Sequence, residues 1–286
     1  MRVLVTGIKG QLGHDVMIEL ERQGHIGIGI DIEDLDITDE PKVREYITNA
    51  NVDAVVHCAA YTAVDAAEDN QDICYKVNTD GALYIANVCK ELDIKYLFLS
   101  TDYVFDGMGE RPWEPNDDRS PLNVYGESKY RAEVAIEKTL EKYFIVRISW
   151  VFGINGHNFI KTMLRLAESH DTITVVNDQI GSPTYTEDLA RLLVDMIQTE
   201  EYGIYHASNE GYCSWYEFAV EIFKIAGIDV NVVPVTSAEY PASKAKRPFN
   251  SRLNKSRLDE KGFKRLPSWQ DATTRYIQEL NKINGK

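Results

Sequence analysis

The sequence predicts an α/β protein with a Rossmann-type, doubly wound parallel sheet and a smaller C-terminal substrate-binding domain. Apolar, β-rich segments recur through the first half of the chain, and each is followed by a segment with helical spacing. Several of these segments are almost continuously apolar, as strands covered by helices on both faces must be. The expected strands are Arg2–Thr6, Ile26–Asp31, Asp53–Ala59, Lys95–Thr101 and Phe144–Ser149.

Helix signals occupy the intervals between these strands. A helix that starts near Gln11 is expected to end at Gly24, and Asp39 with Pro41 marks another helix start. After residue 150 the pattern loosens, with helices expected near 159–169, 187–199, 214–226 and 268–283 and short strands near 172–176 and 230–234. We therefore predict one domain over residues 1–150 and a second over 151–286 that is partly interleaved with the sheet. The irregular loop 106–123 is interpreted as a cover for a site.

Composition limits the partners. The 286 residues carry a formal net charge of -14, which disfavours nucleic acid and anionic membrane surfaces but not a small phosphorylated ligand. The first apolar run ends at Gly7, too early for a signal peptide or a membrane span, so a cytoplasmic protein is expected. The cysteines and histidines show no metal-site spacing, so buried thiols and no metal are expected.

A glycine-rich turn, Gly7-Ile8-Lys9-Gly10-Gln11-Leu12-Gly13, directly follows the first expected strand. Glycines in this position allow a tight turn and close backbone approach to a pyrophosphate, so the turn predicts a dinucleotide cofactor, NADH or NADPH. Asp31, at the end of the second strand, would accept hydrogen bonds from ribose hydroxyls and repel a 2′-phosphate. This favours NADH, but Asp31 could simply end the strand and Lys9 could admit NADPH, so the choice stays open.

Three further residues form a candidate catalytic set. Tyr125 and Lys129 lie one helical turn apart, so their head groups can converge, and an ammonium beside a phenol lowers the pKa of the phenol. The pair alone occurs often by chance. Thr101, however, ends the fourth expected strand at the edge where ligands bind in open α/β sheets. The glycine turn, Thr101 and the tyrosine and lysine pair together favour a catalytic site.

These segments resemble the extended short-chain dehydrogenase/reductase family, whose pattern combines a glycine cradle with a Ser/Thr, Tyr and Lys set. The resemblance is strongest to its dTDP-4-dehydrorhamnose reductase branch and covers nearly the whole chain. It rests on Gly7–Gly13, His57–Asp65, Ser100–Gly107, Tyr125–Lys129, Arg147–Gly153, Asp178–Tyr185, and Arg247-Pro248 with Ser251–Leu253.

The resemblance implies reduction of the C4 ketone of dTDP-4-dehydro-β-L-rhamnose to dTDP-L-rhamnose by hydride from NAD(P)H. Tyr125 would supply the proton, Thr101 would hydrogen-bond the same oxygen, and Lys129 would hold the nicotinamide ribose and lower the pKa of Tyr125. It further implies cofactor contacts at Gly7, Gly10, Gln11, Leu12, Gly13, Asp31, Asp36, Ile37, Ala59, Ala60, Tyr61, Thr62, Leu99, Tyr125 and Lys129. The implied substrate contacts are Thr101, Asp102, Tyr103, Trp150 and Arg247.

Several alternatives remain. A 4,6-dehydratase is disfavoured because Tyr103, rather than Glu, follows Asp102, but a 4-epimerase stays open. A non-catalytic regulatory subunit is disfavoured because the catalytic set is intact. Trp150 could instead fill a core, Asp102 cap a turn and Arg247 be a solvated charge. Some relatives hold magnesium at a dimer interface, where Asp15 and Glu187 would lie, but Asp15 is shorter than their glutamate and no metal is expected. Monomer and homodimer are both compatible with the sequence.

Overall fold

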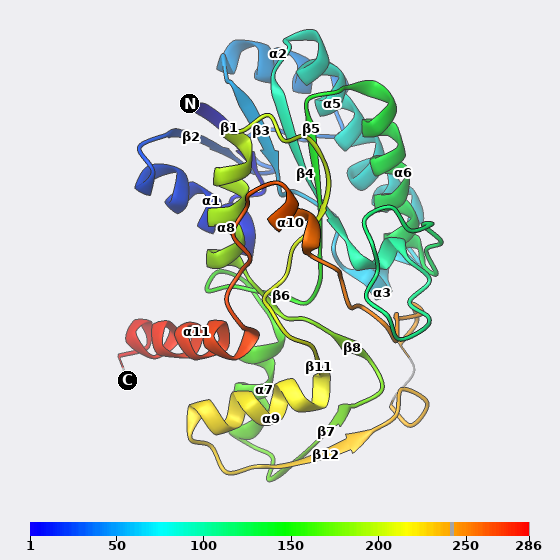
Figure 1. Cartoon of the computed structure of the whole chain (residues 1–286), viewed down its shortest axis with the longest axis vertical. Coiled ribbons are helices and arrows are strands. Elements are labelled where there is room, and N and C mark those ends of the chain that lie inside the picture. Colours follow the sequence, from blue (N-terminus) through cyan, green and yellow to red (C-terminus); the bar gives the residue numbers. More distant parts are fainter. Residues whose placement is uncertain (241–242, 286) are drawn as a thin grey trace.

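The computed structural model, which describes residues 1–240 and 243–285, contains a six-stranded parallel sheet with strand order β10-β5-β4-β3-β1-β2 (Figure 1). This confirms the predicted doubly wound α/β class. The strands are β1 (Arg2–Thr6), β2 (Ile26–Ile30), β3 (Ala54–His57), β4 (Lys95–Thr101), β5 (Tyr143–Ile148) and β10 (Gly203–His206).

Helices cover both faces of this sheet because successive strand residues point to opposite sides. On one face, Val3 and Val5 pack with α1 (Gln11–Arg22) and α8 (Thr186–Ile197). On the other face, Leu4 belongs to a second core. That core includes buried residues of α2 (Glu40–Ala50), α5 (Ala82–Glu91) and α6 (Val124–Thr139) (Figure 1). The sheet is therefore a buried central layer, and the candidate functional residues lie at the ends of its strands.

Local signals explain several helix boundaries. Asp39 accepts a hydrogen bond from the Lys42 N–H at 3.3 Å and Pro41 lies in the first turn, so α2 starts as the sequence predicts.

Between β3 and β4 the chain forms α3 (Val64–Ala67), α4 (Gln71–Tyr75), a π-helical segment η1 (Lys76–Gly81) and α5. A π-helical segment inside a run of α-helix often marks a functional site.

The C-terminal elements gather below the carboxyl edge of the sheet in Figure 1. An aromatic core that includes Phe152, Tyr185, Phe218, Trp269 and Tyr276 holds them together. These elements are β6 (Val151–Phe152), α7 (Phe159–Ala167), β7 (Thr172–Val176), β8 (Ile180–Gly181), β9 (Thr184–Tyr185), β11 (Cys213–Ser214), α9 (Trp215–Ala226), β12 (Asn231–Val235) and α11 (Trp269–Ile283). The short helix α10 (Ser256–Glu260) lies instead beside the main sheet, where Leu258 packs in the same core as α1 and α8 (Figure 1).

The sixth strand of the main sheet, β10, lacked a recognisable sequence signal. Its four residues pair in parallel with β5, and Ile204 lies opposite Ile145. Chain from the C-terminal half thus completes the main sheet. Within the described part of the chain, no helix has both the length and the apolar character needed to cross a membrane.

Candidate active site

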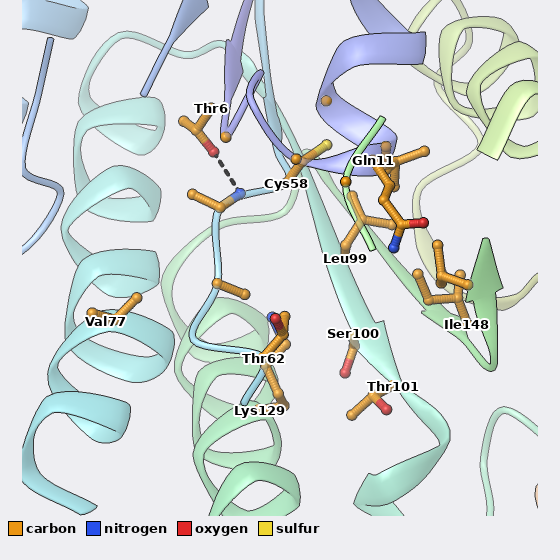
Figure 2. Close-up of a pocket in the computed structure, with 18 of the residues that line it drawn as sticks. Thr6, Gln11, Cys58, Thr62, Val77, Leu99, Ser100, Thr101, Lys129 and Ile148 are labelled. Atoms are coloured by element: carbon orange, nitrogen blue, oxygen red, sulfur yellow. Dashed lines mark hydrogen bonds between the residues drawn. The ribbon is translucent and has the colours of Figure 1, made fainter. Parts of the chain in front are cut away.

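A cavity of about 970 Å³ opens at the carboxyl edge of the main sheet. Its walls come from the carboxyl ends of β1, β2, β3, β4 and β5 and the residues after them, together with the first turns of α6. Figure 2 shows the part of this lining that includes Thr6, Cys58, Thr101, Lys129 and Ile148. Open α/β sheets bind their ligands at this edge. The cavity is therefore the candidate active site, and it contains every residue of the predicted set except Tyr61.

The glycine turn after β1 has a shape that side chains would block. Gly7 has φ +70°, and a Cβ there would lie 2.8 Å from the backbone nitrogen of Ala59. A Cβ on Gly13 would lie 2.3 Å from the carbonyl oxygen of Gly7. No side chain caps the start of α1 at Gly10, so its first N–H groups stay available to an anion. This turn therefore fits a pyrophosphate cradle.

The end of β2 presents a fixed carboxylate. Asp31 accepts hydrogen bonds from the backbone N–H groups of Lys9 and Ile32, each at 2.9 Å, and it lines the cavity. The Lys9 ammonium pairs with Glu33 at 2.7 Å. Asp36 and Ile37 also line the cavity. Two hydrogen bonds from Thr38 lower the pKa of Asp36, so this carboxyl group is ionised at neutral pH.

The loop after β3 is tied down from two sides. The Ala59 N–H donates to the Thr6 hydroxyl at 3.0 Å, which is the dashed line in Figure 2. Asn78, in η1, accepts from the Tyr61 N–H at 2.7 Å and donates to the Tyr61 carbonyl at 3.1 Å. Ala59, Ala60 and Thr62 line the cavity, whereas Tyr61 does not. The loop that carries Tyr61 is therefore held by its backbone to Asn78, while its neighbours Ala60 and Thr62 face the cavity.

Asn78 was not among the sequence candidates. It is buried, and its amide also donates to the hydroxyl of Ser128 in α6 at 2.9 Å. The Ser128 hydroxyl in turn donates to the Tyr125 carbonyl at 2.7 Å. A single amide thus connects the loop after β3 with the helix that carries Tyr125 and Lys129. Asn78 lies in the largely polar segment Lys76–Gly81, so no local pattern marked it.

Thr101, Tyr125 and Lys129 converge on the cavity. Thr101 ends β4, while the other two lie in the first turns of α6, which Asn123 caps by accepting from the Gly126 N–H at 2.8 Å. A Cβ on Gly126 would lie 2.2 Å from the Tyr103 carbonyl oxygen, so this glycine allows α6 to approach the chain after β4. The helix start and the strand end are therefore held together by close backbone packing.

Burial dominates the protonation of this set. It raises the pKa of the Tyr125 phenol well above its ordinary value, and the nearby Thr101 hydroxyl opposes that shift. Burial lowers the pKa of Lys129 to about 7, while the charge of Glu133 acts in the opposite direction. The Lys129 ammonium lies 3.9 Å from the centroid of the Phe98 ring. The sequence predicts that Lys129 lowers the pKa of Tyr125. In the structure this pKa is raised instead, because desolvation of the phenolate is the largest influence on this group.

On the substrate side, Asp102, Tyr103, Trp150 and Arg247 all line the cavity. Asp102 is buried, and its Oδ2 has no hydrogen-bond partner among the described residues. Burial raises the pKa of this carboxyl group to about 6. Arg247 lies within 3.3 Å of the Tyr103 hydroxyl and pairs with Asp65 at 2.8 Å. Both a cation and an unpaired polar atom therefore face this part of the cavity.

A second set of lining residues, in the loop 153–158 after β6, was missed. Its Asn155 side chain donates to the Lys9 carbonyl at 2.8 Å, and its Gly153 N–H donates to the Gln11 side chain at 2.9 Å. Gly156, His157 and Asn158 line the cavity. This loop thus holds the C-terminal half against the glycine turn. Its run of Gly and Asn after an apolar strand was the available signal.

The loop 106–123 does not cover the site, contrary to the interpretation of the sequence. None of its residues, all of which are described, lines the cavity. Trp113 stacks on Phe105 with centroids 4.6 Å apart and forms an isolated β-bridge with Leu253. Apolar packing on the segment around Leu253 therefore directs the loop away from the opening.

The two residues weighed as metal ligands make contacts within the protein. The Asp15 carboxylate accepts a hydrogen bond from the Thr186 hydroxyl. Glu187 pairs with Arg191 in α8 and lies 3.5 Å from Arg275 in α11. Among the described residues, no group of three or more His, Cys, Asp or Glu side chains gathers as a metal site would require.

Comparison with known proteins gives the family. A family model described as RmlD substrate binding domain matches residues 1–282. The spore coat polysaccharide biosynthesis protein SpsK of Bacillus subtilis is 41% identical over 278 residues, covering 97% of each chain. The dTDP-4-dehydrorhamnose reductase of Aggregatibacter actinomycetemcomitans is 40% identical over 285 residues, covering 95% of this chain and 96% of its own.

A solved structure agrees with these sequence matches. The dTDP-4-dehydrorhamnose reductase of Bacillus anthracis, in complex with NADP, superposes with a TM-score of 0.94 at 41% identity and covers 97% of this chain and 99% of its own. The match extends over both halves of the chain, and it confirms the resemblance on which the sequence analysis relied. The chain therefore belongs to the RmlD substrate binding domain family, together with these dTDP-4-dehydrorhamnose reductases.

Proposed function

We propose that this chain reduces the C4 ketone of dTDP-4-dehydro-β-L-rhamnose to dTDP-L-rhamnose with NADH or NADPH. The observation that carries the proposal is the convergence of Thr101, Tyr125 and Lys129 on a cavity that starts at the glycine turn. Membership of a family that includes dTDP-4-dehydrorhamnose reductases supports the choice of sugar nucleotide. The intact catalytic set supports an enzyme over a regulatory subunit.

The glycine turn fits the diphosphate of the cofactor, because Gly7 and Gly13 leave no room for a Cβ and α1 starts without a side-chain cap. When bound, the reduced nicotinamide would supply the hydride. The residues that would hold the cofactor are Gly7, Gly10, Gln11, Leu12, Gly13, Asp31, Asp36, Ile37, Ala59, Ala60, Thr62, Leu99, Tyr125 and Lys129.

Tyr125 is the proton donor in this proposal. Its raised pKa keeps the phenol protonated at neutral pH, so the proton is present when negative charge develops on the C4 oxygen. Thr101, whose hydroxyl donates to Asp102 Oδ1 at 3.0 Å, would exchange this hydrogen bond for one to the same oxygen and stabilise that charge. Both side chains are held by rigid elements, since Thr101 ends β4 and Tyr125 lies in the first turn of α6.

Lys129 would bind the nicotinamide ribose through its ammonium group. Its side chain is only 2% exposed and packs on Phe98, so its head group has a fixed position in the cavity wall. A cation in this position also favours the phenolate that Tyr125 becomes after it gives up its proton. The lysine would thereby stabilise the product state of the proton transfer.

The sugar nucleotide would lie against Asp102, Tyr103, Trp150 and Arg247. The Arg247 guanidinium can pair with a diphosphate by exchanging its contact with Asp65. We propose that residues 1–150 bind the cofactor and that residues 151–286 mainly bind the substrate. The loop 153–158 crosses this division, because it contacts Lys9 and Gln11.

The test is turnover of dTDP-4-dehydrorhamnose, followed as loss of absorbance of NADH or NADPH. We expect Tyr125→Phe to lower kcat by about 100-fold or more, the usual contribution of a positioned acid. Tyr130→Phe, five residues along the same helix, removes a hydroxyl that does not line the cavity and serves as the matched control. No oxidation of either cofactor by folded wild-type protein would refute the proposal. A tightly retained NAD⁺ with C4 epimerisation would indicate the epimerase instead.

A further inference from the structure

Trp150 has a backbone conformation that large side chains avoid. Among the described residues, the non-glycine residues with positive φ are Asn51, Asp93 and Trp150, and the value for Trp150 is +48°. Asn and Asp tolerate this left-handed region, whereas a bulky residue there costs about 1–3 kcal/mol and indicates a constraint that is often functional. Trp150 lines the cavity, so the strain lies at the candidate active site.

The surrounding backbone holds this conformation in place. The Trp150 carbonyl accepts from the Thr184 N–H at 3.0 Å. The Thr184 hydroxyl donates to the carbonyl of Ser149 at 2.6 Å, and the Ser149 hydroxyl donates to the carbonyl of Ser182 at 2.8 Å. Ser149, Ser182 and Thr184 are all buried. The strained peptide is therefore fastened to the chain that enters β9.

The indole ring is fixed separately, by Trp215. The two rings stack with centroids 3.7 Å apart and planes inclined by 16°. Trp215 is itself immobilised, because it is the first residue of α9. That helix starts with a capping box in which Ser214 and Glu217 exchange hydrogen bonds at 3.0 and 2.7 Å. A rigid helix start thus supports the ring of Trp150.

Gly181 provides the remaining constraint. A Cβ at this position would lie 2.8 and 2.9 Å from the Cε2 and Cζ2 atoms of Trp150. The backbone of Gly181 does not have positive φ, so its conformation does not require glycine. The need for glycine comes from the space taken by the Trp150 indole and by Ser251, whose Cβ would lie 3.0 Å from the added Cβ. The Trp150 ring is therefore held by one stacked neighbour and by the absence of one side chain.

We infer that Trp215 and Gly181 are positioning residues that fix the Trp150 indole as a wall of the sugar-nucleotide site, and that they set the affinity for this substrate. The inference rests on the proposed function and goes beyond it, since neither residue lines the cavity. Both residues act on the substrate only through Trp150.

The test compares Gly181→Ala and Trp215→Leu with Trp269→Phe, which alters another tryptophan of the same aromatic core. We expect the first two to raise KM for the keto sugar about tenfold, because small displacements of binding groups are costly. The dissociation constant of NADH should stay unchanged in all three. Trp215→Phe, which keeps an aromatic ring at this position, should retain most of the affinity for the keto sugar that Trp215→Leu loses.

A double variant tests whether Gly181 acts through Trp150. In a Trp150→Phe background the indole is gone and only the contact with Ser251 remains, so Gly181→Ala should raise KM by much less than it does in the wild-type protein. The exciton couplet of the stacked indoles in far-ultraviolet circular dichroism should disappear in Trp215→Leu and in Trp150→Phe alike.

Other outcomes would overturn the inference. If wild-type protein turns over the sugar but Gly181→Ala and Trp215→Leu lower only thermal stability, the two residues are structural. The inference would also fail if the effects of Gly181→Ala and Trp150→Phe on KM were additive in the double variant. It would fail as well if the wild-type protein showed no exciton couplet from the two indoles. Absence of wild-type turnover would instead refute the proposed reductase activity, on which the inference rests.

Discussion

At the scale of single residues, Asp102 is a buried carboxyl group that weakens the fold at neutral pH. Its pKa is raised to about 6 by burial, so the neutral form is favoured in the folded state. Below the ordinary pKa of 3.8 the carboxyl group is neutral in both states and carries no penalty. As pH rises through about 6 the folded protein loses stability, because the buried group must then become charged. Asp102→Asn should therefore stabilise the protein by about 3 kcal/mol at pH 8 and by about half as much at pH 5.

Urea unfolding at the two pH values measures this difference. Asp36→Asn is the control with the opposite sign, because hydrogen bonds from Thr38 lower the pKa of Asp36. It should destabilise the protein by nearly the same amount at pH 8 and at pH 5, because both values lie above the ordinary pKa of 3.8 and the contribution of Asp36 is lost only at lower pH. A gain for Asp102→Asn that does not depend on pH would contradict the assignment of a raised pKa.

Lys129 gives a second pH prediction at this scale. Its pKa is lowered to about 7 by burial, with the charge of Glu133 acting against the shift, so the ammonium fraction falls as pH rises through this value. If the ammonium binds the cofactor ribose, the dissociation constant of NADH should rise above pH 7, by at most about tenfold per pH unit. Fluorescence titration from pH 6 to 9 tests this, and Lys129→Gln should give a flat profile. A flat wild-type profile would exclude the ammonium from cofactor binding.

At the scale of elements, the π-helical segment η1 places Asn78 between the loop after β3 and α6. Asn78→Asp keeps the shape but removes the donors to the Tyr61 carbonyl and to Ser128. We expect a loss of about 1–3 kcal/mol for these buried groups and a raised dissociation constant of NADH. Urea unfolding and fluorescence titration measure the two effects.

Thr79→Val is the matched control in η1. It removes a hydrogen bond to the Ser128 carbonyl at 2.7 Å but leaves the loop after β3 untouched. It should lower stability without changing the affinity for NADH. Equal effects of the two variants on NADH binding would show that η1 acts only as a support for α6.

At the scale of the whole molecule, a buried ion pair joins four parts of the chain. Arg147 in β5 donates to Glu133 in α6 at 2.9 and 2.7 Å, and both side chains are 0% exposed. Arg147 also donates to the carbonyl of Pro115 at 2.9 Å and lies 3.3 Å from His206 at the end of β10. The pair thus connects the main sheet, the catalytic helix and the loop 106–123.

Arg147→Met would leave the Glu133 carboxylate buried and without its main partner. We expect a loss of about 3–5 kcal/mol, the usual effect of breaking a buried pair. Arg131→Met, which breaks a pair with Glu127 on the exposed side of the same helix, should have little effect. Thermal and urea unfolding compare the two, and similar losses would contradict the importance assigned to burial.

The sequence predicted what depends on local pattern. Apolar runs located the strands β1 to β5, the glycine turn located the cradle, and the spacing of Tyr125 and Lys129 placed both on one helix face. The structure adds what depends on distant contacts. Asn78 meets Ser128 fifty residues away, Trp150 meets Trp215, and β10 is recognisable as a strand only beside β5. Such pairs leave no periodic pattern in the sequence, because the two partners are far apart along the chain and the segment around each partner is ordinary by itself.

The most direct test of the central claim follows the transferred hydrogen itself. Wild-type protein would be incubated with dTDP-4-dehydrorhamnose and NADH or NADPH that carries deuterium at the transferable position, and the isolated sugar nucleotide would be examined by NMR and mass spectrometry. The account predicts one deuterium per product molecule, bonded to C4, with no such product from Tyr125→Phe on the same time scale. Oxidation of the cofactor without deuterium at C4, or deuterium at another carbon, would contradict it.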